Sequence, residues 1–226
     1  MKGPFEVFTD VYCVGGGGIS SAGDCLIYLI DAREELILID VGVTDHDRIL
    51  NNVKKLGFDT NKITSIIITH CHIDHVGNLK ILKNILKAKL YAHELDAEVL
   101  EKGGEKTADF FYGIKYKPVK IDIKFRQSLE KIIIGNKELN ILHIPGHTPG
   151  GIAPYLDIYE TRILFSQDTH GPLFPNFGSD RKKFVESLKK MQELDSDILC
   201  EGHFGIYKGK KEVYNYIQQY INEFSR

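Results

Sequence analysis

The sequence lacks the features that mark several classes of protein. It contains no apolar run approaching the roughly 20 residues that cross a membrane, and its start, MKGPFEVFTD, lacks the apolar core of a secretory signal. The net charge of −2 comes without a clustered basic surplus, which nucleic-acid binding usually needs. We therefore expect a small-molecule substrate as the partner, and neither a membrane nor a nucleic acid.

Cysteine is scarce and scattered along the chain. Cys13, Cys25, Cys71 and Cys200 form no Cys-x-x-Cys pair, so we predict reduced thiols and a cytoplasmic location rather than a disulfide framework. No internal repeat or low-complexity linker divides the chain, and 226 residues with 42% hydrophobic content suffice for a substantial core. The sequence predicts one domain over residues 1–226 and leaves a homo-oligomer open.

Strand patterns fill both halves of the chain and helical patterns interrupt them, which indicates packed sheets with helices outside. The expected strands cover residues 5–14, 25–30, 36–42, 63–69, 89–93, 131–136, 138–146, 152–158, 161–168 and 197–203. Thr44 and Asp47 resemble a capping box that opens a helix ending at Gly57. Further helices are expected over residues 77–87, 94–101, 180–194 and 213–224. The glycine run 15–18 predicts a turn, because no Lys-Ser/Thr follows it as in a phosphate loop.

The segment ITHCHIDHVGN, residues 68–78, crowds metal-capable side chains at the end of a β-branched strand. If the segment stays extended, His70, His72 and Asp74 share a face, and His75 can join them at the turn into a helix. Imidazole and carboxylate are the donors expected for zinc and similar divalent metals. The pattern therefore predicts a metal site.

Three more polar residues end apolar strands in the second half of the chain. They are His147 in IPGHTPGG, Asp168 in SQD and His203 in EGH. With the first cluster they give enough donors for two metals about 3.5–4 Å apart that share a carboxylate and a hydroxide. We expect two divalent ions, with zinc favoured over iron or manganese.

Taken together, LILIDVG, THCHIDH, IPGHTPGG, SQD and EGH resemble the metallo-β-lactamase-fold superfamily. The resemblance implies an α/β fold, an αββα four-layer sandwich. It implies a first metal site of His70, His72 and His147, a second site of Asp74, His75 and His203, and a bridge at Asp168. By the same resemblance, Asp40 would orient one of the ligands.

Other candidate residues receive simpler interpretations. We expect His46 and His93 to be solvated, His143 to sit in the core or at a strand edge, and Cys71 to pack in the core. His170 follows Asp168 closely and is expected to line the pocket. The segment 103–119 is rich in Phe and Tyr and is expected to be either a cover over the metal cleft or ordinary packing.

The predicted reaction is hydrolysis of an ester, thioester or lactone by a metal-bridging hydroxide, with Asp74 holding the hydroxide and moving its proton. The motifs THCHIDH and IPGHTPGG are most similar to those of the glyoxalase II (hydroxyacylglutathione hydrolase) branch. The run THGPLFPNFGSD replaces that branch's Gly-Cys-Gly-Arg run, and no separate substrate domain follows His203. The tyrosine of lactonases is replaced by Gly171, with Tyr112 or Tyr116 as candidate substitutes.

Two alternatives are open. A persulfide dioxygenase-like oxidoreductase would hold one iron by His147, Asp168 and either His70 or His72. A degenerate binding module would lack catalysis altogether, but the complete donor set argues against it.

Overall fold

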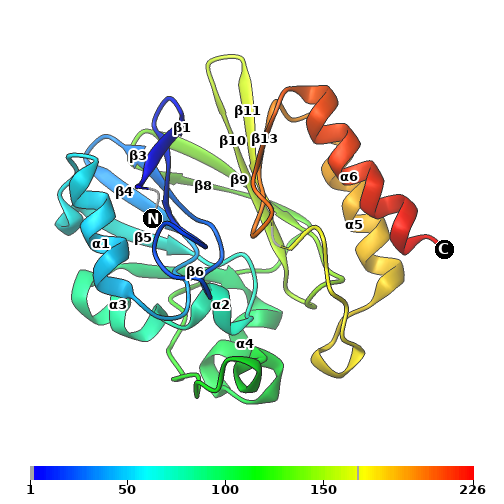
Figure 1. The fold of residues 1–226 in the computed structure, drawn as a ribbon, viewed down its shortest axis with the longest axis horizontal. Coiled ribbons are helices and arrows are strands. Elements are labelled where there is room, and N and C mark those ends of the chain that lie inside the picture. The colour runs from blue at the N-terminus through cyan, green and yellow to red at the C-terminus, as the bar shows by residue number, and fades with distance from the viewer. Residues whose placement is uncertain (1–2, 167) are drawn as a thin grey trace.

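Two mixed β-sheets face each other in the computed structural model, which describes residues 3–166 and 168–226 (Figure 1). The first sheet contains β1 (Phe5–Phe8), β2 (Val11–Gly15), β3 (Ile27–Ala32), β4 (Glu35–Ile39), β5 (Ile63–Ile67), β6 (Lys89–His93) and β7 (Ile123–Phe125), in that order. The second contains β13 (Ile206–Lys208), β12 (Ile198–Cys200), β11 (Thr161–Phe165), β10 (Ile152–Ile158), β9 (Lys137–His143) and β8 (Leu129–Ile134). The strands β4 to β7 run parallel, as do β11 and β12.

Helices cover the outer face of each sheet. On the first sheet lie α1 (His46–Lys55), α3 (Leu79–Leu86) and α4 (Glu94–Lys102), and on the second lie α5 (Arg181–Glu193) and α6 (Lys210–Phe224). A short helix, α2 (Ile73–Val76), lies between β5 and α3 along the chain. The order of layers is helix, sheet, sheet, helix, which confirms the predicted αββα sandwich.

Side-chain alternation along the strands builds three apolar layers. In β3, Leu29 faces the helices while Ile30 faces the other sheet. In β11, Leu164 faces α5 and α6 while Ile163 and Phe165 face the first sheet. Because both faces of these strands are buried, they read as continuous apolar runs in the sequence.

The first helix begins differently from the prediction. Its N-cap is Asp45, whose carboxylate accepts the backbone N–H of Arg48 at 3.0 Å, so the predicted capping box of Thr44 and Asp47 is wrong. The short carboxylate of Asp45 satisfies an N–H that lacks a partner inside the helix. The end of the helix matches the prediction, since Gly57 follows it with a φ of +90°.

Chain segments that carry the predicted metal donors leave the sheets at one edge. Asp40 follows β4, His70 follows β5, Asp168 follows β11 and His203 follows β12, each after the carboxyl end of its strand. Parallel neighbours end at the same edge, which brings these segments together. Within the described ranges, no helix has the length and apolar character needed to cross a membrane.

The interface between the sheets generates a stability prediction. Phe165 is fully buried there, and its ring meets that of Tyr28 edge-on with centroids 5.4 Å apart. We expect Phe165→Ala to lower the free energy of unfolding by about 3–5 kcal/mol, because it leaves a cavity between two close-packed sheets. Urea unfolding measures the loss. The exposed Phe5→Ala is the matched control and should cost less than about 1 kcal/mol; equal losses would contradict this account of the core.

Candidate metal centre

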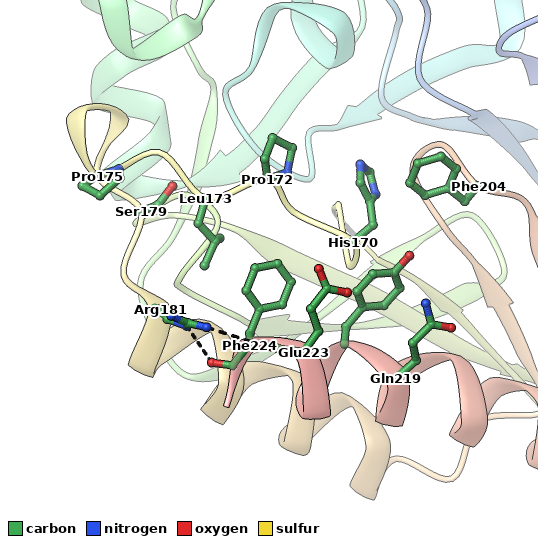
Figure 2. Close-up of a pocket in the computed structure, with 11 residues that line it drawn as sticks. His170, Pro172, Leu173, Pro175, Ser179, Arg181, Phe204, Gln219, Glu223 and Phe224 are labelled. Carbon is green, nitrogen blue, oxygen red and sulfur yellow. Dashed lines mark hydrogen bonds between the residues drawn. The ribbon is translucent and has the colours of Figure 1, made fainter. Parts of the chain in front are cut away.

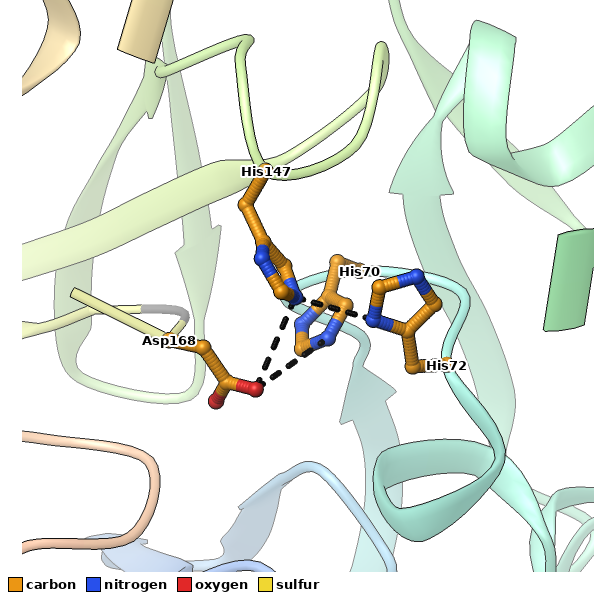
Figure 3. A group of neighbouring side chains, drawn as sticks. All are labelled: His70, His72, His147 and Asp168. Atoms are coloured by element: carbon orange, nitrogen blue, oxygen red, sulfur yellow. Dashed lines mark hydrogen bonds and ion pairs between the residues drawn. The ribbon is translucent and has the colours of Figure 1, made fainter. Parts of the chain in front are cut away.

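Two sets of donor atoms gather at the shared edge of the sheets. His70, His72, His147 and Asp168 form the first set, and Asp74, His75, Asp168 and His203 form the second. Within each set the donor atoms lie within 4.8 Å of one another. Figure 3 shows the three imidazoles of the first set converging with the Asp168 carboxylate. The structure thus brings together all seven donors proposed from the sequence.

Asp168 stands between the two sets. Its Oδ2 lies 3.5 Å from Nε2 of His147 and 3.9 Å from Nε2 of His70. Its Oδ1 lies 3.1 Å from Nε2 of His75 and 3.4 Å from Nε2 of His203. Each oxygen of this buried carboxylate therefore faces a different set. Gln167, which precedes Asp168 in the quoted SQD motif, lies outside the described residues.

Asp40 orients a histidine in each set. Its Oδ2 lies 2.8 Å from Nδ1 of His75 and also accepts the Thr69 hydroxyl at 2.6 Å. Having donated its proton to Asp40, Thr69 Oγ1 is left to accept from Nδ1 of His70, 3.2 Å away. In both rings Nδ1 is thus engaged by this network, and Nε2 is the nitrogen that faces the donor sets.

Asp74 reaches the second set by a route that the sequence did not predict. The expected extended segment ends at His72, which is the N-cap of α2, and Asp74 and His75 lie in the single turn of that helix. The alternation of an extended chain therefore does not place Asp74. The helical turn places it instead, with Oδ2 3.0 Å from Nε2 of His203.

Protonation differs between the two sets in the metal-free chain. Burial lowers the pKa of His70 and His147, and lowers that of His72 to about 3, so these rings are neutral. Burial acts in the same direction on His203, but the Asp168 and Asp74 carboxylates outweigh it and raise its pKa to about 10. A divalent cation would compete with protons only in the second set.

The donor chemistry fits divalent metal ions. Nε2 of His70 is a buried atom that finds no hydrogen-bond partner among residues 3–166 and 168–226. Nδ1 of His72 and Nε2 of His147 lie only 2.8 Å apart, close enough for both to face one ion. Buried nitrogen and oxygen atoms aimed at a common point are the usual donors of zinc and related metals.

A buried carboxylate that the sequence analysis missed links two of the ligand-bearing loops. Asp96, on α4, is 1% exposed and accepts the backbone N–H of Cys71 at 3.0 Å. It also accepts the Thr148 hydroxyl and the Gly150 N–H, both at 2.7 Å. Gly150 permits this approach, since a Cβ there would lie 2.4 Å from the Asp96 backbone nitrogen. Asp96 thereby ties the loop of His70 and His72 to the loop of His147.

Glu201 performs the same function for the other two loops. Its Oε1 accepts the Thr169 N–H and lies 2.9 Å from Nδ1 of His170, while its Oε2 accepts the N–H of His203 and of Phe204. The side chain is completely buried. The sequence signal for Glu201 was a glutamate directly after the apolar strand DILC. For Asp96 it was an acidic residue on the face of its helix that is buried.

The remaining histidines and Cys71 take structural positions. His93 is 3% exposed and stacks on His143 with centroids 3.8 Å apart, so the expected solvation of His93 is wrong. His143 ends β9, with Nε2 2.9 Å from the Pro149 carbonyl. His46 is partly exposed on α1, and Cys71 is buried in the core under the helices, as expected.

The aromatic segment 103–119 lies beside the second set. Tyr112 is close enough to Asp74 that, together with burial, this carboxylate raises the pKa of the phenol. Tyr116 is 4% exposed and belongs to the apolar core, so of the two tyrosines only Tyr112 lies at the centre. Whether the segment moves as a cover stays a prediction.

A cavity of about 730 Å³ opens next to the second set. Figure 2 shows His170 and Phe204 at one end, with Leu173 above and Phe224 below, on the loop after Asp168 and on α6 respectively. His170 also belongs to a cluster with Asp168 and Glu201, so the expected position of His170 in the pocket wall matches the structure.

The hydrogen bonds of Asp96 generate a prediction. Asp96→Asn turns an acceptor oxygen into an NH₂ group that must face one of three donors. We expect the metal affinity of the first set to fall about 10–100-fold, measured by competition with a chromophoric chelator. Glu98→Gln, an exposed change on the same helix, is the control and should bind metal as the parent does. Parental affinity in Asp96→Asn would show that the link is dispensable.

Comparison with known proteins agrees with this geometry. The pattern of the metallo-beta-lactamase superfamily matches residues 21–203. An uncharacterized protein of Aquifex aeolicus is 31% identical over 194 residues, which cover 81% of this chain and 85% of that protein. A hydroxyacylglutathione hydrolase of Haemophilus influenzae is 27% identical over 186 residues, 78% of this chain and 83% of that enzyme.

A solved structure shows the same arrangement of sheets and helices. The metallo-beta-lactamase GOB-18 from Elizabethkingia meningoseptica is 26% identical, with a TM-score of 0.79, and the match covers 99% of this chain and 90% of that one. Since the superfamily pattern spans most of the sequence and the donor sets lie at the edge where its strands end, this chain belongs to the metallo-β-lactamase superfamily.

Proposed function

We propose that this protein is a binuclear metal-dependent hydrolase that cleaves an ester, thioester or lactone bond of a small molecule. The observation that carries the proposal is the position of Asp168, whose two oxygens face different donor sets. A carboxylate in this position can bridge two ions about 3.5–4 Å apart, as in many binuclear hydrolases. The similarity to a hydroxyacylglutathione hydrolase supports an acyl substrate.

Zinc is the proposed metal in both sets. Bound there, two divalent ions would polarise a substrate carbonyl and lower the pKa of water, which makes hydroxide available as a nucleophile near neutral pH. In this scheme His70, His72 and His147 hold one ion, while Asp74, His75 and His203 hold the other. Asp40 fixes the rings of His70 and His75 through their Nδ1 atoms.

Asp74 is the residue placed to move the proton. Its Oδ2 lies 3.0 Å from Nε2 of His203, and the partly exposed Tyr112 lies close to its carboxylate. We assign to its carboxylate the acceptance of a proton from the attacking water and the delivery of that proton to the leaving group. The Thr169–Asp180 segment stands where the glyoxalase II branch has its glutathione-binding run, which argues against a glutathione conjugate as the substrate.

A mononuclear iron dioxygenase remains the alternative. It would use His147 and Asp168 with His70 or His72, and it would leave Asp74, His75 and His203 without an ion. The close gathering of that second set favours the hydrolase instead. A single domain and a cytoplasmic location belong to the proposal as well; the latter is supported by four cysteines that lie buried as free thiols.

The metal content and the reaction separate these two candidates. From protein purified without added metal we expect about two equivalents of divalent metal, chiefly zinc, because each donor set is complete. We expect turnover on a panel of thioesters, lactones and esters, and no oxygen consumption with a persulfide. If the protein instead contains one equivalent of iron and consumes oxygen, the dioxygenase is the correct assignment and the hydrolase is excluded.

A pair of variants separates the bridge from the orienting residue. Asp168→Asn removes the negative charge between the two sets, so both ions should bind more weakly and turnover should fall by orders of magnitude. Asp40→Asn should lower affinity or activity only about 10–100-fold, though at both sets, because Asp40 orients a histidine in each. Metal analysis and thioester hydrolysis of both variants provide the measurement. Two ions and parental turnover in Asp168→Asn would overturn the bridging assignment.

A further inference from the structure

Four phenylalanines from two distant segments form one aromatic patch, which we call the rim. Phe110 and Phe111 belong to the 3₁₀ turn η3 (Asp109–Tyr112), while Phe174 and Phe177 flank and end the turn η4 (Pro175–Phe177). The ring centroids of Phe111 lie 5.7 Å from Phe174 and 5.9 Å from Phe177, and Phe110 lies 5.8 Å from Phe177. The rim therefore joins the segment 103–119 to the loop that follows Asp168.

The rim adjoins the donor sets directly. The buried ring of Phe177 meets His72 edge-on with centroids 6.3 Å apart. At the other end of η3, Tyr112 lies beside Asp74. The turn η4 also separates two cavities, because Pro175 lines the 730 Å³ cavity and Phe177 lines a second one of about 510 Å³. Through Phe177 the rim is therefore an apolar surface within reach of a molecule bound at the first donor set.

Exposure distinguishes the rim from core packing. Phe110 and Phe111 are 57% and 58% exposed, and Phe174 is 38% exposed. Clustered aromatic rings left open to water on a folded chain usually mark a binding surface. All four side chains are uncharged and offer only ring faces and edges, which suits an apolar group rather than an anionic one.

We propose that the rim holds an apolar acyl chain of the substrate, so that the preferred ester or thioester carries a medium-length acyl group. This inference rests on the proposed hydrolytic function and names its substrate class. Each methylene covered by the rim should raise kcat/KM about twofold to fourfold. A second copy of this chain docked on the rim is the competing occupant.

The test is an acyl series of thioesters, from acetyl to octanoyl, assayed with the metal-loaded enzyme. We expect kcat/KM to rise along the series in the parent. In the Phe110→Ala/Phe111→Ala variant, the octanoyl-to-acetyl ratio should fall about tenfold or more. Tyr159→Ala removes an aromatic ring that is 83% exposed in the β10–β11 turn and serves as the control, which should keep the parental ratio. The same ratio in parent and double variant would overturn the inference.

Two further measurements distinguish the remaining outcomes. Light scattering that shows a parental dimer and a monomeric double variant would assign the rim to a second copy and overturn the inference. If the parent hydrolyses neither this series nor the panel of esters and lactones, the proposed function fails, and calorimetric binding of primary alkyl amides decides the inference alone. Affinity that grows with chain length only in the parent supports an acyl site, and equal or absent binding excludes it.

Discussion

Buried carboxylates that must find hydrogen-bond donors are the constraint on which the metal centre depends. A charge removed from water is costly unless it is paired, and Asp40, Asp96 and Glu201 are each at most 3% exposed. Their partners lie on loops that would otherwise be joined only at the strand ends. Each acid accepts hydrogen bonds from the loops around it and thereby holds those loops in place. The histidines on the loops are positioned as a result.

These acids connect different parts of the fold. Asp96 extends from α4, outside the first sheet, to a loop of the second sheet near Gly150. Glu201 joins two loops of the second sheet, and the Tyr28 hydroxyl of the first sheet donates to its carbonyl at 2.7 Å. Other polar links between the sheets lie away from that edge, such as the Gly135 N–H donated to Glu35 and the Lys208 ammonium donated to the Val7 carbonyl. Phe165 and its neighbours hold the middle of the interface by apolar contact.

Sequence reasoning reached the layers and the seven donors because both leave local signals. Alternating apolar residues mark buried strands, and a histidine at the end of such a run stands out. The linking residues leave weaker signals, because the donors bound by Asp96 lie as far away as Gly150 and share no spacing with it. His93 was misassigned for the same reason, since its partner His143 is brought near only by the packing of the sheets. The start of α2 at Ile73 was missed for a similar reason. The chain leaves the first sheet after Ile68, whose N–H donates to the Tyr91 carbonyl, and no local spacing marks that point.

The metal centre and the rim differ in how firmly their residues are held. The donors are held by acids with two to four partners each, so a substitution there disturbs several loops at once. Of the rim rings, Phe110, Phe111 and Phe174 are exposed, so their replacement costs little packing. We therefore expect substrate preference to vary through Phe110, Phe111 and Phe174 while the metal centre stays intact, because the acids that hold the donors make no use of those rings.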